Sequence, residues 1–406
     1  MPSPGQPGQP GRPWGRALAG AAIAGCLGLV AACAAAPPTP RPAPWLVRSD
    51  YQRVTGQAVR RDCGYSSPLP GRPGWSLWLF CDTVVTSADG RAIDRLILGT
   101  DTAAEGPDQP GLPPGWLTEV PTPPARPTPP TRPALSAAAA PQPFLPAPDG
   151  LELPGSLLPC AGAGSYPAAW ISGVTAAPPA AGRLLIAYDD YCVTGSADAP
   201  AAERFGLVEY DPAVNVLGPV TPVFRSGFGL PLPPQQVLGS PVVSDDGYLY
   251  LFGFCQAAPP PAGCGTGRVF LARTVDAPAD WGNPFAYQYW TGDGWSAQAS
   301  AAGSLIPAGQ PLGLSVGDYA ADGHGLVMIE QTTLAGGFQA WQARSPAGPW
   351  RRLLAARVPC TPGADPGAEG LCRALIGHPE LSTPSDLLIS YYDPGNGQVS
   401  VAAYPW

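Results

Sequence analysis

The stretch from Leu238 to Arg273 limits the fold more than any other part of the chain, because short apolar runs alternate there with tight turns. Asp245-Asp246-Gly247 predicts a hairpin turn, since Asp-Gly supplies the positive φ values that such a turn needs. The run from Tyr248 to Phe254 is apolar or aromatic at nearly every position, which is typical of a strand covered on both faces. Val269 to Ala272 predicts a third strand. We interpret the stretch as one blade of a β-propeller.

Four other segments repeat this pattern of short strands and turns, at residues 62–100, 156–210, 314–350 and 374–404. The 57 Pro and 51 Gly residues favour turns over helices, and no segment carries a long amphipathic helical pattern. We therefore predict an all-β chain folded as a five-bladed β-propeller. A sandwich of two sheets is the alternative. It would not naturally yield five segments that each begin with a short strand containing polar residues.

A proline-rich stretch follows the first predicted blade. In that blade Trp75 to Asp82 is the clearest strand, residues 87–90 predict a turn, and residues 93–99 predict a further strand. Residues 107–150 are too rich in proline for a helix or a central strand. We expect them to form a connector on the surface between blades one and two. A linker between two domains is the alternative, although blade one alone is too small to stand free.

The N-terminus has the pattern of an export signal. Two arginines precede an apolar run of small residues, Ala17 to Ala32, which suits a secretory signal better than a membrane span. The residues before Cys33 resemble a bacterial lipobox, so we predict a lipoprotein signal peptide at residues 1–33, with Cys33 as the lipidated residue. Cys26 also fits, with a shorter apolar core. An ordinary cleaved signal and an uncleaved anchor are the other interpretations.

The lipoprotein assignment sets the expected boundaries and location. Residues 34–49, rich in Pro and Ala, would form a disordered tether, and residues 50–406 would form the propeller. Attachment through more than one acyl chain anchors a protein stably. We expect an exported monomer that its lipid holds at the outer face of the cytoplasmic membrane.

The remaining eight cysteines also indicate export, because disulfides persist in oxidising compartments. They fall in close sequence pairs, and pairing of neighbours is the simplest of many connectivities: Cys63 with Cys81, Cys160 with Cys192, Cys255 with Cys264, and Cys360 with Cys372. Zinc is the competing use of cysteine. The chain has no Cys-x-x-Cys pair and only 2 His, so we expect no metal site.

Charge and motifs argue against several functional classes. The net charge of −8 makes nucleic acid an unexpected partner. The sequence contains no P-loop, dinucleotide fingerprint or EF-hand loop, and no Gly-x-Ser-x-Gly at a strand-to-helix elbow. We therefore expect no cofactor and no serine triad.

Function in a propeller concentrates on the first strand of each blade, which lines the central channel. The candidate inner strands place these residues near the channel: Asp62, Trp170, Ser240, Asp318 and His378, with Glu380 just beyond. We predict that Trp170, Asp318, His378 and Glu380 bind substrate. Pro379 would keep His378 extended and at an exposed mouth. The alternative for this histidine is a structural role.

Asp62 and Asp82 flank the predicted Cys63–Cys81 bridge. Bridged Cα atoms lie about 4.4–6.8 Å apart, so the bridge would bring the two carboxyls within several ångströms of each other. Two close carboxylates repel, which raises one pKa. A protonated carboxyl beside an ionised one is what a glycosidase acid/base pair requires. The alternative is that both aspartates cap turns.

Other acidic and aromatic residues make weaker candidates. We interpret Asp189 and Asp190 as turn residues, and Glu330 as a strand residue that either faces inward or is exposed. Several tryptophans could stack on sugars, although such rings more often pack between blades. They are Trp170, Trp290, Trp295 and Trp341.

Several short stretches resemble one family, at residues 62–66, 77–83, 269–273, 290–295, 348–350, 377–382 and 389–392. That family is an actinobacterial group of secreted or lipoprotein domains, long catalogued as of unknown function. It is similar to five-bladed propeller glycoside hydrolases and includes endo-D-arabinanases. The resemblance covers roughly residues 50–406 and implies that Asp62 and Asp82 are the catalytic carboxylates. The sequence departs from the family pattern at Phe80-Cys81-Asp82, where a Gly commonly precedes the Asp, and in its proline-rich insertion.

Two functional hypotheses follow. In the first, an exported, lipid-anchored propeller hydrolyses furanoside polysaccharide of arabinan type in the cell envelope, with Asp62 and Asp82 as acid and base. In the second, a non-catalytic propeller lipoprotein binds glycan or a partner protein. Arginine pairing of both aspartates would favour the second hypothesis.

Overall fold

The computed structural model describes residues 40–86, 100–112, 114–124, 134–152, 158–160, 164–177, 182–194, 202–225, 236–255, 269–307, 311–361 and 370–406. The predicted signal peptide, with Cys33, lies outside these described residues. So do residues 87–99, with the turn and the strand predicted there. Within the described part of the chain, no helix is both long enough and apolar enough to cross a membrane.

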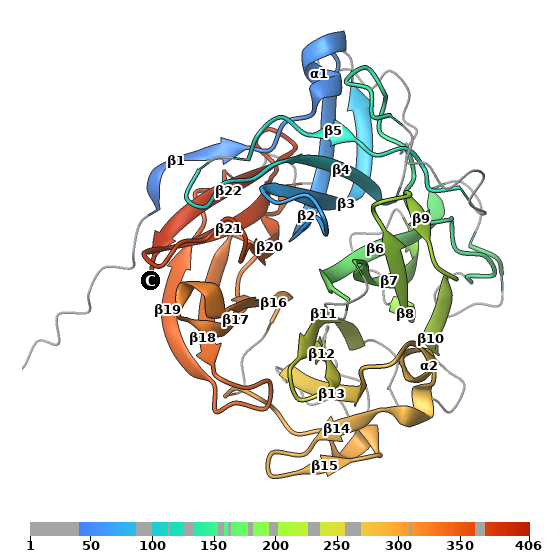
Figure 1. Ribbon diagram of the computed structural model, residues 1–406, viewed down its shortest axis with the longest axis vertical. Helices are drawn as coiled ribbons and strands as arrows, with labels where there is room; N and C mark the ends of the chain where they lie inside the picture. The colour runs from blue at the N-terminus through green and yellow to red at the C-terminus, as the bar shows by residue number, and fades with distance from the viewer. Residues whose placement is uncertain are drawn as a thin grey trace, which may run out of the picture. The chain divides into compact units, whose positions relative to one another are not determined.

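Five small antiparallel sheets make up the fold, and in each the first strands follow chain order from the inner edge outward (Figure 1). Blade one contains β2 (Ala58–Pro68), β3 (Trp75–Thr86), β4 (Thr102–Pro107) and β5 (Thr118–Glu119). Blade two contains β6 (Ser165–Ala176), β7 (Leu184–Thr194), β8 (Ala202–Asp211) and β10 (Thr221–Arg225), with β9 (Val216–Leu217) paired to β8. Blade three contains β11 (Gln236–Ser244), β12 (Tyr248–Cys255), β13 (Val269–Val275), β14 (Gln288–Trp290) and β15 (Trp295–Ser296).

The last two blades continue the same arrangement. Blade four contains β16 (Gly313–Tyr319), β17 (Gly325–Gln331), β18 (Gly337–Ala343) and β19 (Arg351–Arg357). Blade five contains β20 (Arg373–Gly377), β21 (Asp386–Asp393), β22 (Gln398–Pro405) and, as its outermost strand, β1 (Arg41–Leu46). The described helices are short: α1 (Asp50–Thr55), α2 (Pro278–Trp281), and single 3₁₀ turns at Pro284–Ala286, Ala299–Ala301 and Ala320–Asp322.

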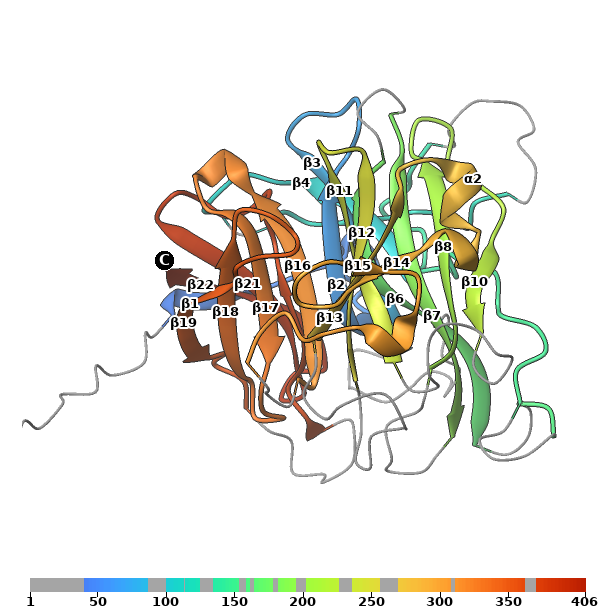
Figure 2. The ribbon, with the colours of Figure 1, turned by 90° about the horizontal axis from the view of Figure 1, so that it is seen from below.

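The five inner strands, β2, β6, β11, β16 and β20, form a closed ring. Each contacts the inner strands of its two neighbouring blades, and β20 contacts β2. Figure 2 shows the same sheets from the edge of the ring. The predicted five-bladed propeller is therefore confirmed. The inner strands carry Asp62, Trp170, Ser240 and Asp318, and His378 directly follows β20, as expected.

The apolar run in blade three is buried on both faces because a blade flanks each side. Leu249 and Leu251 of β12 pack with side chains of blade two, whereas Tyr250 and Phe252 pack with side chains of blade four. Gly247 in the preceding hairpin has a φ of 82°, which glycine adopts without steric cost. The core is thus a set of apolar layers between neighbouring blades, which explains why the strand shows no polar alternation.

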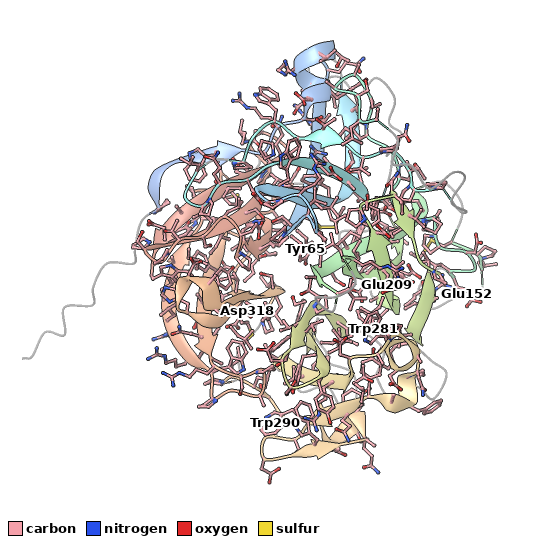
Figure 3. All side chains as sticks on the ribbon, viewed as in Figure 1. Tyr65, Glu152, Glu209, Trp281, Trp290 and Asp318 are labelled. Carbon is pink, nitrogen blue, oxygen red and sulfur yellow. A yellow bond between two sulfur atoms is a disulfide. The ribbon has the colours of Figure 1, made fainter. Side chains whose placement is uncertain are left out.

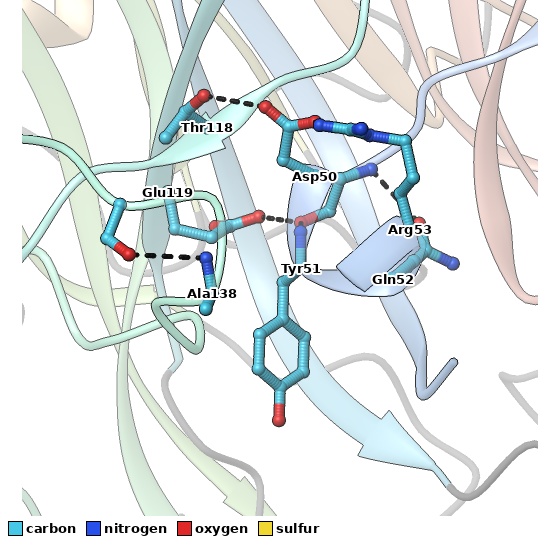
Figure 4. Close-up of polar contacts among 9 residues, drawn as sticks. Asp50, Tyr51, Gln52, Arg53, Thr118, Glu119 and Ala138 are labelled. Atoms are coloured by element: carbon cyan, nitrogen blue, oxygen red, sulfur yellow. Dashed lines mark hydrogen bonds and ion pairs between the residues drawn. The ribbon is translucent and has the colours of Figure 1, made fainter. Parts of the chain in front are cut away.

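A strand from the N-terminal side of the chain completes blade five. β1 pairs with β22, and Ser49 then caps the N-terminus of α1. The hydroxyl of Thr118 donates to Asp50 of that helix, which ties it to blade one (Figure 4). The structure therefore differs from the tether expected for residues 34–49, because residues 41–49 pack onto the propeller as a strand and a helix cap.

The proline-rich stretch also differs from the surface connector expected at residues 107–150. It contributes β5 to blade one, and Leu117 and Val120 on either side of that strand are buried. Phe144 and Leu145 are buried in the apolar layer between blades one and two. A few buried apolar side chains therefore fix a proline-rich segment whose strand, β5, is only two residues long.

Three of the predicted disulfides are present, joining Cys63 to Cys81, Cys160 to Cys192, and Cys360 to Cys372. Pairing of sequence neighbours is confirmed for these six cysteines. Cys264, the predicted partner of Cys255, lies outside the described residues.

Candidate active site

The Cys63–Cys81 bridge joins β2 to β3, with a Cα–Cα distance of 5.4 Å. The register between these strands shifts on both sides of Cys63, whose φ is 62°. A bulge of this kind adds a residue to one strand and re-aims its side chain. Asp62 stands in the bulge and Asp82 follows the bridged Cys81, so the two carboxyls are close enough for the charge of one to act on the other.

Two neutral donors from blade two hold Asp82. The hydroxyl of Tyr166 donates to Oδ2 at 2.8 Å, and the indole Nε1 of Trp170 donates to Oδ1 at 3.0 Å. Both donors stand on β6, four residues apart. Trp170, predicted to bind substrate, therefore contacts a predicted catalytic carboxyl. The spacing of Tyr166 and Trp170 along the inner strand places one donor at each oxygen.

Burial, and after it the negative charge of Asp62, raise the pKa of Asp82, which lies at about 7. The hydrogen bonds from Trp170 and Tyr166 and the positive charge of Arg373 oppose this rise. Asp82 consequently changes its protonation state near neutral pH, where an ordinary aspartate is fully ionised.

Asp62 has a cationic partner instead. Arg373 Nε and Nη2 each lie 2.9 Å from Asp62 Oδ2, and the guanidinium also stacks on the ring of Tyr392 at 4.2 Å. The side chains of Asp62 and Arg373 are 13% and 32% exposed, so the pair is accessible to solvent. Both nitrogens of the guanidinium thus bond to one carboxylate oxygen of Asp62. The site combines a carboxyl with a raised pKa and a carboxyl paired with a cation, a contrast that acid/base hydrolysis can use.

A third carboxyl, which the sequence reasoning missed, lies near Asp82. Asp101 is buried just before β4, and it accepts the backbone N–H groups of Phe144 and Leu145 at 2.9 and 2.5 Å. Burial raises the pKa of Asp101 to about 7, and the charge of Asp82 contributes. These bonds attach the proline-rich stretch to the back of the site, so we assign Asp101 a structural role.

His378 and Glu380 form a separate buried cluster with Ser66. The hydroxyl of Ser66 lies 2.5 Å from His378 Nδ1 and donates to Glu380 Oε1. The side chain of His378 is fully buried against the ring of Trp78. The cluster joins blade one to blade five but does not contact Asp82. Its burial fits a structural role and does not fit the direct substrate contact predicted for His378 and Glu380.

Asp318 is exposed at the end of β16, where its carboxylate accepts the backbone N–H of Ala320 and thereby caps a turn. Figure 3 labels it at the inner edge of blade four and Trp290 at the outer edge of blade three. Trp290 packs against Trp295, and Trp341 is buried and donates to Glu330. Of the predicted substrate contacts, the structure brings only Trp170 to the aspartate pair.

The interpretation of Asp189 and Asp190 as turn residues is wrong. Both lie inside β7 and are buried, at 1% and 2% exposure. Asp190 forms an ion pair with Arg204, at 3.0 Å from Nε to Oδ2. Burial raises the pKa of Asp189 well above its ordinary value. Glu330 is buried as well, so it is not an exposed strand residue.

In the described part of the chain, one group of possible metal ligands stands close together, namely Asp62, Cys63 and Cys81. The two sulfurs are bonded to each other in a disulfide. They therefore offer no thiolate, and the group does not fit a metal ion.

Similar folds occur among solved structures. A Bacteroides ovatus protein described as a candidate hydrolase has a TM-score of 0.54 at 15% identity, over 85% of each chain. A family 117 glycoside hydrolase from Zobellia galactanivorans has a TM-score of 0.44 at 10% identity, over 89% of each chain. A GH43_1 enzyme from Xanthomonas citri has a TM-score of 0.41 at 11% identity, over 88% of this chain and 92% of that one. At these identities the similarity concerns the fold alone.

No curated protein sequence matches the chain. A match to a sequence family covers less than half of it. Residues 234–402, from β11 into β22, are similar to the family described as "Domain of unknown function (DUF5005)".

Proposed function

We propose that the protein is a glycoside hydrolase that cleaves furanoside polysaccharide of arabinan type, with Asp82 as general acid and Asp62 as general base. The proposal rests on one observation, the unequal environments of the two neighbouring carboxyls. Asp82 is held by neutral donors and its pKa is raised to about 7, mainly by burial, whereas Asp62 is paired with the cation of Arg373. Carboxyls in such contrasting environments divide the acid and base roles between them.

Two similarities support this proposal. The Bacteroides ovatus protein with the same fold is described as a candidate hydrolase. The short stretches around Asp62 and Asp82 resemble a family that includes endo-D-arabinanases, and this resemblance supplies arabinan as the substrate class.

The site of action in this proposal is the cell envelope, with lipidated Cys33 as the anchor and envelope polysaccharide as the partner. β1 begins at Arg41, eight residues after Cys33. Eight extended residues span at most roughly 29 Å. A monomeric propeller on so short a tether would act on polysaccharide next to the membrane.

The test is digestion of arabinan by the full-length protein, followed by the appearance of reducing ends. Asp82→Asn and Asp62→Asn are each expected to lower the rate by about 10²–10⁴-fold, the usual contribution of one acid or base. NMR of the first-formed anomer distinguishes inversion from retention. Cleavage that persists unchanged in both variants would rule out the assigned residues.

A non-catalytic glycan-binding propeller is the second candidate, and the Arg373–Asp62 ion pair favours it, because a paired carboxylate also suits a static binding surface. Arginine pairs with only one of the two aspartates among the described residues, because Asp82 accepts its hydrogen bonds from the neutral donors Tyr166 and Trp170. Under this alternative the wild-type protein binds arabinan in a pull-down assay but releases no reducing ends.

A further inference from the structure

The two donors that hold Asp82 differ in chemistry. The indole N–H of Trp170 can only donate a hydrogen bond, whereas the hydroxyl of Tyr166 can donate or accept. When Asp82 is protonated, Oδ1 must therefore remain the acceptor for Trp170, 3.0 Å away. The proton then resides on Oδ2, directed at the hydroxyl oxygen of Tyr166, 2.8 Å away.

Protonation of Asp82 also changes what Tyr166 can do. Once the hydroxyl oxygen accepts the proton of Asp82, its own hydrogen is released from Asp82 and can point to another acceptor. Tyr166, at the start of β6, and Asp82 are both partly exposed, but both oxygens of Asp82 are already engaged by donors. The hydroxyl of Tyr166 is thus the end of a short hydrogen-bonded chain that can turn to a new acceptor.

Charged and titratable groups face this chain from each neighbouring element. Asp62 on β2 and Arg373 on β20 act on both Asp82 and Tyr166, and Asp101 before β4 acts together with Asp82. Burial and the carboxylates raise the pKa of Tyr166, so the hydroxyl stays protonated and can pass a proton only if it receives one.

We propose that Tyr166 is a catalytic residue that relays the proton of Asp82 to the glycosidic oxygen, an inference that rests on the proposed function. Asp82 Oδ2 loses its hydrogen to the hydroxyl oxygen of Tyr166, and the hydroxyl hydrogen moves to the glycosidic oxygen. The bond from that oxygen to the anomeric carbon breaks, and the leaving sugar departs as an alcohol. Water attacks the anomeric carbon and gives its proton to Asp62. Tyr166 ends as it began, Asp82 is ionised and Asp62 is protonated.

The competing role for Tyr166 is general support of the site, which would serve proton donation and water attack alike. A relay and a support differ in how they depend on the leaving group. An arabinan leaving group departs as an alkoxide unless it receives a proton, whereas a nitrophenolate leaves without one. Loss of a proton relay should therefore harm arabinan cleavage and spare cleavage of an activated aryl furanoside.

The experiment measures kcat/KM of the full-length protein on arabinan and on the nitrophenyl glycoside of a short arabinofuranose oligomer. Tyr166→Phe removes the hydroxyl and keeps the ring. We expect about 10²-fold lower activity on arabinan, the scale of general acid catalysis, and a change below about 3-fold on the nitrophenyl substrate. Asp82→Asn should show the same difference between the two substrates. The matched control is Tyr191→Phe, which makes the same chemical change in a tyrosine whose ring contacts that of Trp170 at a tilt, with the ring centroids 4.7 Å apart. Tyr191→Phe should change kcat/KM on the two substrates by the same factor.

Retained activity on the nitrophenyl substrate also shows that Tyr166→Phe is folded. Equal losses on both substrates would mean that Tyr166 supports the site, and unchanged activity on both would mean that it has no role. Either result overturns the relay while leaving the proposed function intact. A wild-type protein that is inactive on both substrates would instead overturn the proposed function, and the relay with it.

Discussion

Arg373 on β20 holds Asp62 on β2 through two nitrogens, Nε and Nη2, each 2.9 Å from Oδ2. The two residues are 311 positions apart in the chain, and their blades are neighbours because β20 contacts β2. The ion pair therefore exists only when the ring is closed. In this protein the cationic partner of the first blade's aspartate arrives only with the last blade.

Replacing Arg373 should change the pH dependence of the proposed reaction. The positive charge of Arg373 lowers the pKa of Asp82, so Arg373→Gln should raise that pKa. A pH–rate profile on arabinan should then show its basic limb moved upward by a fraction of a pH unit, with a lower maximum. Arg351→Gln is the control, because Arg351 bonds to Gln342 on blade four. A limb that stays in place would show that Arg373 does not act on the acid.

Asp82 should make the folded state less stable as pH rises. Its pKa is about 7 in the folded protein and about 3.8 in the unfolded chain, so the folded state binds more protons between these values. The free energy of unfolding must then fall as pH increases from about 4 to about 7. Asp82→Asn cannot ionise and should lose less stability than wild type between about pH 5 and pH 8. Urea unfolding of both proteins at the two pH values measures this. Equal losses of unfolding free energy in wild type and Asp82→Asn would contradict the shifted pKa.

The Cys63–Cys81 bridge should affect both stability and activity, because it lies beside both aspartates. Replacing both cysteines by Ala should lower the free energy of unfolding by roughly 2–4 kcal/mol. It should also lower activity at temperatures where the protein remains folded. The matched double variant at Cys160 and Cys192 should cost similar stability and less activity. Equal activity losses would show that the first bridge does not position the site.

The boundary between tether and fold can be located by truncation. A chain that starts at residue 40 keeps β1 and should unfold at the same temperature as the longer chain. A chain that starts at residue 47 lacks β1 and leaves an edge of β22 unpaired. Its midpoint should be several degrees lower in a thermal melt. If the two truncations melt together, β1 contributes nothing to closure.

The Ser66 cluster should be important for folding rather than catalysis. Ser66→Ala removes the hydroxyl that His378 and Glu380 share in a buried site. The free energy of unfolding should fall by about 1–3 kcal/mol, because buried polar groups lose their hydrogen-bond partner. The pH–rate profile should keep its shape. A displaced profile would place these residues in the reaction.

The sequence predicted the parts of the fold that depend on local pattern. Turn residues and apolar runs located the inner strands, and two cysteines 18 positions apart located Asp62 and Asp82. β1 was missed because its prolines match a flexible tether, although an edge strand also tolerates them. Asp189 and Asp190 were misread because adjacent strand residues point to opposite faces, so that only one could face a site, and burial of both inside β7 is a property of the assembled blades.

The partners of the aspartates could not be predicted in the same way. Tyr166 is 84 positions from Asp82, and Arg373 comes from the far end of the chain. Which side chains meet across two blades depends on the bulge at Cys63 and on how neighbouring sheets pack, and no local pattern records either. A weak signal existed for Arg373, since it follows Cys372 at the start of an inner strand, as Asp82 follows Cys81.

The pairing of β1 with β22 has a consequence for biosynthesis. β1 leaves the ribosome early, and the strand that it pairs with is made about 360 residues later. β1 therefore has no strand to pair with through nearly all of translation. We expect the ring to close in one late step, and a nascent chain paused before β22 to be open to proteases along the unpaired β1.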